Sequence, residues 1–169
     1  MKETNWVVVT GPPSSGKTSI IKMLAMHGFI TCPEVARELI VEGLNKNKCP
    51  QVETFQREIL AITCRREHLL SVKELIFFDR GIPDSIAYFK YNNLVIDPAF
   101  KASLFRRYNL IFYCCGLPII KDGIRQESAD AAAAIGQLIL EAYQMLNYKP
   151  IILPAISLEE RFNIILDNI

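Results

Sequence analysis

One segment of the 169-residue chain has the residue types and spacing of a phosphate-binding loop. Residues 11–18, Gly-Pro-Pro-Ser-Ser-Gly-Lys-Thr, fit the pattern of a glycine, four residues, then Gly-Lys-Ser/Thr. The two glycines let the backbone wrap closely around phosphate, so that N–H groups and a helix N-terminus face the anion. Lys17 would reach the β- and γ-phosphates, and the Thr18 hydroxyl would bind Mg²⁺. The predicted nucleotide contacts are Gly11, Pro12, Pro13, Ser14, Ser15, Gly16, Lys17, Thr18 and Ser19.

A carboxylate and a guanidinium follow one another at the end of a second apolar run, Phe77-Phe-Asp79-Arg80-Gly81. At the carboxyl end of a strand beside the phosphate loop, Asp79 would hold Mg²⁺ or its water, and Arg80 would stabilise the charge of transferred phosphate. The alternative is an exposed Asp-Arg pair at an ordinary strand end. Because a phosphate loop is present in the same chain, we favour the functional interpretation.

Two shorter segments are candidates for the remaining roles of a phosphotransferase. Glu34 and Arg37 lie three residues apart, on one helical face, where Glu34 would accept a proton from an acceptor hydroxyl and Arg37 would anchor the acceptor. The alternative is a surface ion pair worth a few tenths of a kcal/mol. Residues 122–125, Asp-Gly-Ile-Arg, offer a flexible glycine and a cation that would close over the phosphates as a lid; a solvated turn is the alternative.

The elements that must position these residues alternate along the chain. Short apolar runs predict strands at 6–10, 29–32, 75–79, 109–114 and 149–153. Helical patterns cover 18–27, 33–43, 51–72, 84–91, 98–107 and an alanine-rich segment through 146, and a capping box at Ser157–Glu160 opens a final helix. This alternation predicts one α/β domain over residues 1–169, with a parallel sheet covered by helices on both faces.

Composition excludes several other classes of protein. Nineteen Lys and Arg against 18 Asp and Glu give a net charge of +1, too weak a field for nucleic acid or an anionic membrane as the main partner. The five cysteines are an odd number without a CxxC pair, so reduced, mostly buried thiols are expected. The start of the chain does not resemble a signal peptide, and no apolar stretch is long enough to span a bilayer. We therefore expect a cytoplasmic protein.

The order of motifs resembles the AAA-like ATPase/kinase domain family. The resemblance rests on the phosphate loop, Glu-Val-Ala-Arg-Glu at 34–38, Phe-Asp-Arg-Gly-Ile-Pro-Asp at 78–84, Asp-Gly-Ile-Arg at 122–125, and the Leu153-Pro154 segment before the last helix. It implies a P-loop NTPase fold of the nucleoside-monophosphate-kinase kind, a three-layer α/β/α sandwich with a five-stranded parallel sheet in the order 2-3-1-4-5. It also implies a lid arginine at Arg125 and a contact near the nucleotide base at Pro154.

Together these observations predict an ATP- and Mg²⁺-dependent kinase acting on a hydroxyl of a nucleoside-like or other small molecule. The expected catalytic residues are Lys17, Glu34, Asp79, Arg80 and Arg125; the metal ligands are Thr18 and Asp79; the acceptor contacts are Glu34, Arg37, Arg80 and Asp84. The alternative is a regulatory ATPase or a nucleotide-gated binding module. Asp79 is followed by arginine rather than by a water-activating glutamate, which weakens that alternative. The acceptor and the oligomeric state are left open.

Overall fold

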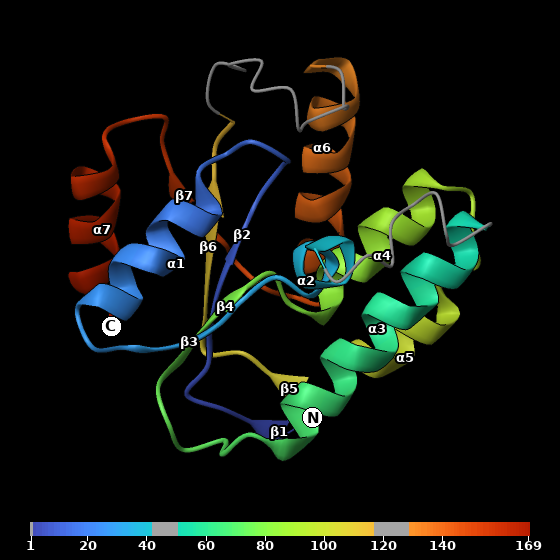
Figure 1. Ribbon diagram of the computed structural model, residues 1–169, viewed down its shortest axis with the longest axis horizontal. Coiled ribbons are helices and arrows are strands. Elements are labelled where there is room, and N and C mark those ends of the chain that lie inside the picture. The colour runs from blue at the N-terminus through green and yellow to red at the C-terminus, as the bar shows by residue number, and fades with distance from the viewer. Residues whose placement is uncertain (1, 42–50, 117–128) are drawn as a thin grey trace.

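The computed structural model describes residues 2–41, 51–116 and 129–169 (Figure 1). Its main sheet has five parallel strands: β2 (Val7–Thr10), β3 (Ile30–Cys32), β4 (Ile76–Asp79), β6 (Leu110–Cys114) and β7 (Ile151–Leu153). They lie in the order β3-β4-β2-β6-β7, which is 2-3-1-4-5 when these five are counted along the chain. The α/β class and the parallel sheet predicted from the sequence are confirmed.

Helices cover both faces of this sheet, which makes three layers (Figure 1). On one face lie α1 (Lys17–Met26) and α7 (Leu158–Leu166), which pack against each other. On the other face lie α3 (Val52–Leu69), α4 (Ile82–Tyr91), α5 (Asp97–Ser103) and α6 (Ala129–Met145). The short helix α2 (Val35–Val41) packs against α3.

The central strand β2 explains why the sequence forms a sheet with two buried faces. Val7 and Val9 belong to the core beneath α1 and α7, whereas Trp6 and Val8 belong to the core beneath α4 and α6. Successive side chains of a strand point to opposite faces, so an uninterrupted apolar run is what a strand buried on both sides requires. Because all five strands are parallel, the loops that follow them meet at one edge of the sheet.

The sequence-based prediction of a helix through residue 107 is wrong at its end. Helix α5 ends at Ser103, and Arg106–Arg107 form strand β5, which pairs in parallel with β1 (Lys2–Glu3) in a separate two-stranded sheet. The Arg107 carbonyl accepts hydrogen bonds from the backbone N–H and the hydroxyl of Thr4, at 3.0 and 2.9 Å. These partners are about a hundred residues apart in the chain, so no local pattern indicates them.

The sequence also predicted that no segment spans a membrane and that the cysteines are mostly buried thiols. Within the described ranges, no helix is both long and apolar enough to cross a membrane. Cys32, Cys64, Cys114 and Cys115 carry free thiols, and of these four only Cys114 is buried. The expectation of mostly buried thiols is therefore wrong for the cysteines that the structure describes, while Cys49 lies outside those residues.

The predicted capping box at the start of α7 is present and generates a stability prediction. The Ser157 Oγ accepts from the Glu160 N–H at 3.2 Å, and the Glu160 carboxylate accepts from the Ser157 N–H at 3.0 Å. Ser157→Ala should lower the free energy of unfolding by about 1 kcal/mol, measured by urea denaturation. The control Thr54→Ala, at an exposed position of α3, should change it by less than about 0.5 kcal/mol. Equal effects of the two substitutions would contradict the role of the cap.

Candidate active site

Two glycines shape the loop between β2 and α1. Gly16 adopts a left-handed conformation with φ of 84° immediately before the first residue of α1. Gly11 has φ of 137°, and a Cβ at this position would lie 2.4 Å from the carbonyl oxygen of Cys114. Glycine at position 11 therefore lets the loop pass directly against the end of β6, and glycine at position 16 turns it into the helix.

Lys17 is enclosed by the loop that it follows. Its side chain is only 5% exposed, and its Nζ donates to the Pro12 carbonyl at 2.6 Å and to the Ser15 Oγ at 3.1 Å. Burial lowers the pKa of Lys17 to about 8, and the nearby Arg80 adds to this. An anion bound in the loop would stabilise the protonated form of this lysine, since opposite charges at short range favour ionisation.

Thr18 and Asp79 bring a hydroxyl and a carboxylate together across the strand ends. The Thr18 Oγ1 donates to the Asp79 Oδ2 at 2.9 Å, while the other carboxylate oxygen, Oδ1, is buried without a hydrogen-bond partner in the part of the chain that the structure describes. Burial and the neighbouring Glu34 raise the pKa of Asp79. An orphaned carboxylate oxygen beside a hydroxyl fits Mg²⁺, which binds to one or two protein oxygens and keeps several waters.

Arg80 lies at the centre of a partly buried charge cluster. Its Nε donates to Glu34 Oε1 at 2.7 Å, and its Nη1 donates to Asp84 Oδ1 at 3.0 Å and to the Gly11 carbonyl at 3.2 Å. The guanidinium also lies 5.3 Å from the centre of the Tyr88 ring. Burial alone would lower the pKa of Arg80, but Tyr88, Glu34 and Asp84 raise it well above its usual range. The arginine is thus charged and held in one orientation.

Arg80 has an unusual backbone conformation, and its partner Glu34 has a shifted pKa. Arg80 has φ of 74°, in the left-handed region that costs a side-chain-bearing residue about 1 kcal/mol or more. Burial would raise the pKa of Glu34, but Arg80 and Lys17 lower it overall. Glu34 is therefore ionised at neutral pH. The left-handed backbone at Arg80 places its guanidinium within hydrogen-bond distance of Glu34.

Asp84 organises the cluster from the first turn of α4. Its Oδ1 accepts from the Thr10 hydroxyl at 2.7 Å as well as from Arg80, and its Oδ2 accepts from the Tyr143 hydroxyl at 2.7 Å and from the Gly81 N–H at 3.1 Å. The side chain is 3% exposed. Both oxygens are already occupied by protein donors, so the geometry favours a positioning role for Asp84, and its predicted contact with an acceptor stays a prediction.

Gly81 lies between two tyrosine hydroxyls. A Cβ at this position would lie 2.9 Å from the Tyr143 hydroxyl and 3.0 Å from the Tyr108 hydroxyl. Tyr143 donates to Asp84, and the Tyr108 hydroxyl accepts from the Ile82 N–H at 2.9 Å. The absence of a side chain at position 81 therefore allows both tyrosines to reach the start of α4.

Arg161 is a residue that the sequence-based reasoning missed. It is 2% exposed, and its guanidinium donates to three backbone carbonyls: Ser15 at 2.6 Å, Pro154 at 2.6 Å and Cys115 at 3.2 Å. It thus ties the phosphate loop to the segments that follow β6 and β7. The available signal was its place on the buried face of α7 beside Phe162, where a charged residue needs compensating partners.

The structure brings together most of the residues predicted for the site. Arg37 is exposed. Glu34 pairs with Arg80 and does not form the surface ion pair with Arg37 that the helical spacing allowed. Arg37 nevertheless helps to lower the pKa of Glu34. Pro154 is exposed and contributes its carbonyl to Arg161. Arg125 and the rest of the predicted lid lie outside the described residues.

Comparison with known proteins finds a family match over most of the chain. The sequence model of a family described as "AAA domain" matches residues 6–161. No curated protein sequence matches the chain.

Solved structures with the same fold include a NadR protein and two kinases. NadR protein in complex with NAD and AMP-PNP has a TM-score of 0.74 at 16% identity, over 97% of this chain and 49% of that one. Deoxyadenosine kinase from M. mycoides with bound dATP has a TM-score of 0.69 at 16% identity, over 96% of this chain and 97% of that one. Thymidylate kinase from Candida albicans has a TM-score of 0.60 at 16% identity, over 98% of this chain and 90% of that one. This chain spans about half the length of the NadR chain.

The contacts of Arg161 predict that a lysine cannot replace it. A lysine side chain would keep the charge but could not reach three carbonyls at once, because its ammonium is a single point on a flexible stem. Arg161→Lys should lower the free energy of unfolding by roughly 2 kcal/mol, since buried carbonyls lose their donors, and this can be measured by urea denaturation. Arg65→Lys, at an exposed position on α3, is the matched control and should have little effect. An Arg161→Lys variant as stable as this control would show that Arg161 does not hold the loop.

Proposed function

The chain belongs to the AAA domain family, and on that premise we propose that it is an ATP- and Mg²⁺-dependent kinase that phosphorylates a hydroxyl of a nucleoside-like or other small molecule. The observation that carries the proposal is the partly buried Glu34–Arg80 pair, which lies against the phosphate loop through the Gly11 carbonyl. A carboxylate able to accept a proton and a guanidinium able to stabilise phosphate charge are thereby held beside the loop that would bind ATP.

The nucleotide side of the proposal rests on the phosphate loop. The backbone N–H groups of the loop and of the first turn of α1 would hold the phosphates, and Lys17 would exchange its contacts with Pro12 and Ser15 for phosphate oxygens. Thr18 and Asp79 would hold Mg²⁺, in agreement with the orphaned Oδ1 of Asp79. When bound, this ion neutralises charge on the phosphate oxygens.

The acceptor side of the proposal rests on Glu34 and Arg80. Glu34 is ionised, so it would accept the proton that the attacking hydroxyl loses, and it would also orient that hydroxyl. Arg80 is held by its Nε and Nη1 contacts with described residues, and its guanidinium would donate to an oxygen of the transferred phosphoryl group. Asp84 would keep Arg80 in that orientation without touching the acceptor. Arg37 and the lid arginine Arg125 would supply further positive charge around the reactants.

Two observations favour a nucleoside-like acceptor and a cytoplasmic setting. The solved structures that share the fold over nearly their whole length include a deoxyadenosine kinase and thymidylate kinases. The described free thiols suit a reducing compartment in which ATP is also available. A net charge of +1 gives no reason to expect nucleic acid as a partner.

Acceptor-dependent release of ADP is the decisive test. Purified protein with ATP and Mg²⁺ should release ADP only when a suitable member of a panel of nucleosides and vitamins is added.

Glu34→Gln should lower kcat by roughly 100-fold while changing the nucleotide Kd less than about twofold, because the proton acceptor is lost and the phosphate loop is intact. Glu38→Gln, which affects the ion pair between Glu38 of α2 and Arg66 of α3, is the control and should keep most of the activity. Lys17→Ala should abolish the reaction.

Two outcomes would contradict parts of this proposal. Steady ATP hydrolysis that no acceptor accelerates would favour the regulatory ATPase. Loss of nucleotide binding in Glu34→Gln, together with loss of activity, would indicate that Glu34 only positions Arg80.

The lowered pKa of Lys17 predicts a pH dependence of nucleotide binding. Phosphates favour protonated Lys17, so binding above pH 8 must take up a proton that the free protein has lost. The affinity for an ATP analogue should therefore fall by only about twofold between pH 7 and 8 and by up to about tenfold per pH unit above that. Isothermal titration calorimetry at several pH values measures this. Lys17→Arg, which cannot be deprotonated in this range, should remove the dependence. An equal fall in wild type and Lys17→Arg would refute the assignment to Lys17.

A further inference from the structure

Two hydroxyls from different parts of the fold converge on the Asp84 carboxylate. The Thr10 hydroxyl, at the end of β2, donates to Oδ1 at 2.7 Å, and the Tyr143 hydroxyl, on α6, donates to Oδ2 at 2.7 Å. Both of these side chains are 0% exposed, so water cannot take the place of either donor. Arg80 Nη1 also donates to Oδ1, and the Gly81 N–H also donates to Oδ2. The carboxylate that binds Arg80 is thus held by one hydroxyl on each of its oxygens.

The Tyr143 hydroxyl remains protonated and therefore remains a donor. Burial raises the pKa of Tyr143 well above its usual range, and the neighbouring Asp84 carboxylate adds to this. An ionised tyrosine would repel the carboxylate, whereas the neutral hydroxyl donates to it. The hydrogen bond from Tyr143 to Asp84 is therefore formed at neutral pH.

Helix α6 holds Tyr143 close to the phosphate loop. Gly136 precedes Tyr143 by about two helical turns and lies on the same face of α6. A Cβ on Gly136 would lie 3.1 Å from the Cβ of Pro12 and 2.8 Å from the Tyr113 hydroxyl, so the helix backbone passes directly against the loop. Helix α6 also packs against α4, whose first turn carries Asp84. One helix therefore contacts both the phosphate loop and the carboxylate beside it.

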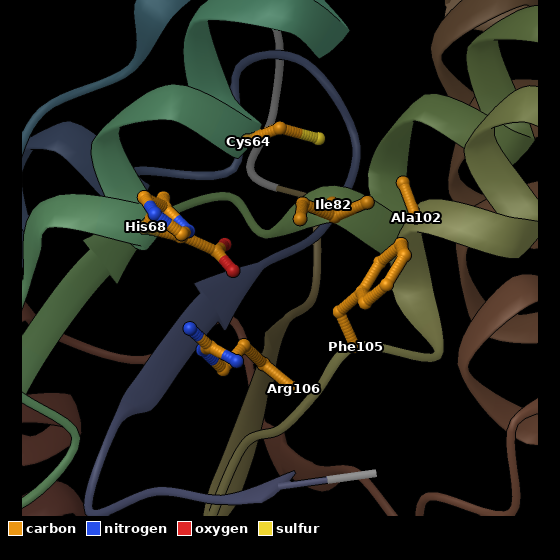
Figure 2. A pocket seen from close by; sticks show the side chains of 7 residues that line it. Cys64, His68, Ile82, Ala102, Phe105 and Arg106 are labelled. Carbon is orange, nitrogen blue, oxygen red and sulfur yellow. The ribbon is translucent and has the colours of Figure 1, made fainter.

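The start of α4 is fixed from its other side as well. The Ile82 N–H donates to the Tyr108 hydroxyl at 2.9 Å. Figure 2 shows Ile82 on that side, where its side chain lines a pocket between α3 and α5. These contacts do not involve Tyr143, so they keep the backbone of α4 in place when the Tyr143 hydroxyl is removed. Loss of this hydroxyl therefore frees the Asp84 side chain and leaves the helix where it is.

We propose that Tyr143 and Thr10 are positioning residues of the phosphoryl transfer. By fixing both oxygens of Asp84, they keep the Arg80 guanidinium in one orientation beside the phosphate loop. In the reaction, the bond between the γ-phosphorus and the ADP oxygen breaks, a bond to the acceptor oxygen forms, and the acceptor proton passes to Glu34. The effect on turnover rests on the proposed function, whereas the effect on the orientation of Arg80 does not.

Removal of the Tyr143 hydroxyl tests the proposal. Tyr143→Phe deletes one oxygen atom and leaves Oδ2 of Asp84 with the Gly81 N–H as its donor among the described residues. The Nε–H of Arg80 donates to Glu34, so its exchange with water reports how firmly the guanidinium is held. In the ¹⁵N-labelled full chain this signal is identified by its absence in Arg80→Lys. Without nucleotide, the exchange measured by NMR should become at least about threefold faster in Tyr143→Phe.

The same substitution should change turnover more than nucleotide binding. In Tyr143→Phe, kcat should fall by roughly tenfold and the Kd of an ATP analogue should change by less than about twofold, because Lys17 and the loop keep their contacts. Tyr148→Phe is the matched control, since Tyr148 is also buried and its hydroxyl accepts from the Tyr108 N–H at 3.1 Å instead. This control should leave both the exchange of the Arg80 Nε–H and kcat unchanged.

Three outcomes would overturn the proposal. The first is an Arg80 Nε–H that exchanges in Tyr143→Phe as it does in wild type. The second is equal acceleration of this exchange in Tyr148→Phe, which would indicate a general loosening of the fold. The third is an unchanged kcat in Tyr143→Phe despite faster exchange. If Tyr143→Phe does not fold, unchanged exchange in Thr10→Val, which removes the other hydroxyl and keeps the shape of the side chain, overturns it equally.

Failure of the proposed function would be seen separately. It would appear as wild-type protein that shows no acceptor-dependent release of ADP. The exchange of the Arg80 Nε–H in Tyr143→Phe and Tyr148→Phe would still decide whether Tyr143 positions Arg80, because that measurement needs no acceptor and no nucleotide.

Discussion

The guanidinium of Arg80, whose side chain is 12% exposed, sets the arrangement of one half of the site. Removing such a charge from water costs several kcal/mol unless it is paired and hydrogen-bonded, so its partners must be held in place. Those partners come from different loops: Gly11 follows β2, Glu34 follows β3, and Asp84 lies in the first turn of α4. A single side chain at the end of β4 therefore fixes the positions of its neighbours at the carboxyl edge of the sheet.

Arg161 does the same for the other half of that edge. Its three carbonyl partners follow β2, β6 and β7, whereas the partners of Arg80 follow β2, β3 and β4. In the strand order β3-β4-β2-β6-β7, the phosphate loop follows the central strand. The two arginines hold the loop from opposite sides, because Arg80 donates to the Gly11 carbonyl and Arg161 donates to the Ser15 carbonyl. The loop geometry is thus set by long-range contacts as well as by its glycines.

Local sequence patterns predicted the strands of the main sheet and the loop and helix that follow β2. The apolar runs predicted every strand of the main sheet, and the spacing of Gly16, Lys17 and Thr18 predicted the phosphate loop and the helix after it. Asp79 lies next to Thr18, as expected for strand ends that share one edge of a parallel sheet. These features follow from side-chain alternation, turn geometry and parallel pairing, all of which short segments encode.

Tertiary contacts decided the parts that the sequence did not indicate. Helical spacing suggested Arg37 as the partner of Glu34, but Arg80, 46 residues away, offers a buried and better oriented guanidinium. Residues 106 and 107 left the expected helix because they pair with strand β1. The contacts of Arg161 could not be predicted from a motif, because its partners are backbone carbonyls, which every residue has. Pairings between distant segments carry no local signature.

The bare backbone at Gly81 joins two regions that otherwise have no residue in common. The hydroxyls of Tyr143 and Tyr108 approach it from the side of Asp84 and from the side of Glu67, respectively. Any side chain at this position would displace both tyrosines, and with them the hydrogen bonds that Tyr143 makes with Asp84 and Tyr108 makes with Glu67. A mutation at position 81 therefore cannot adjust one region alone, so selection on either region constrains the evolution of the other.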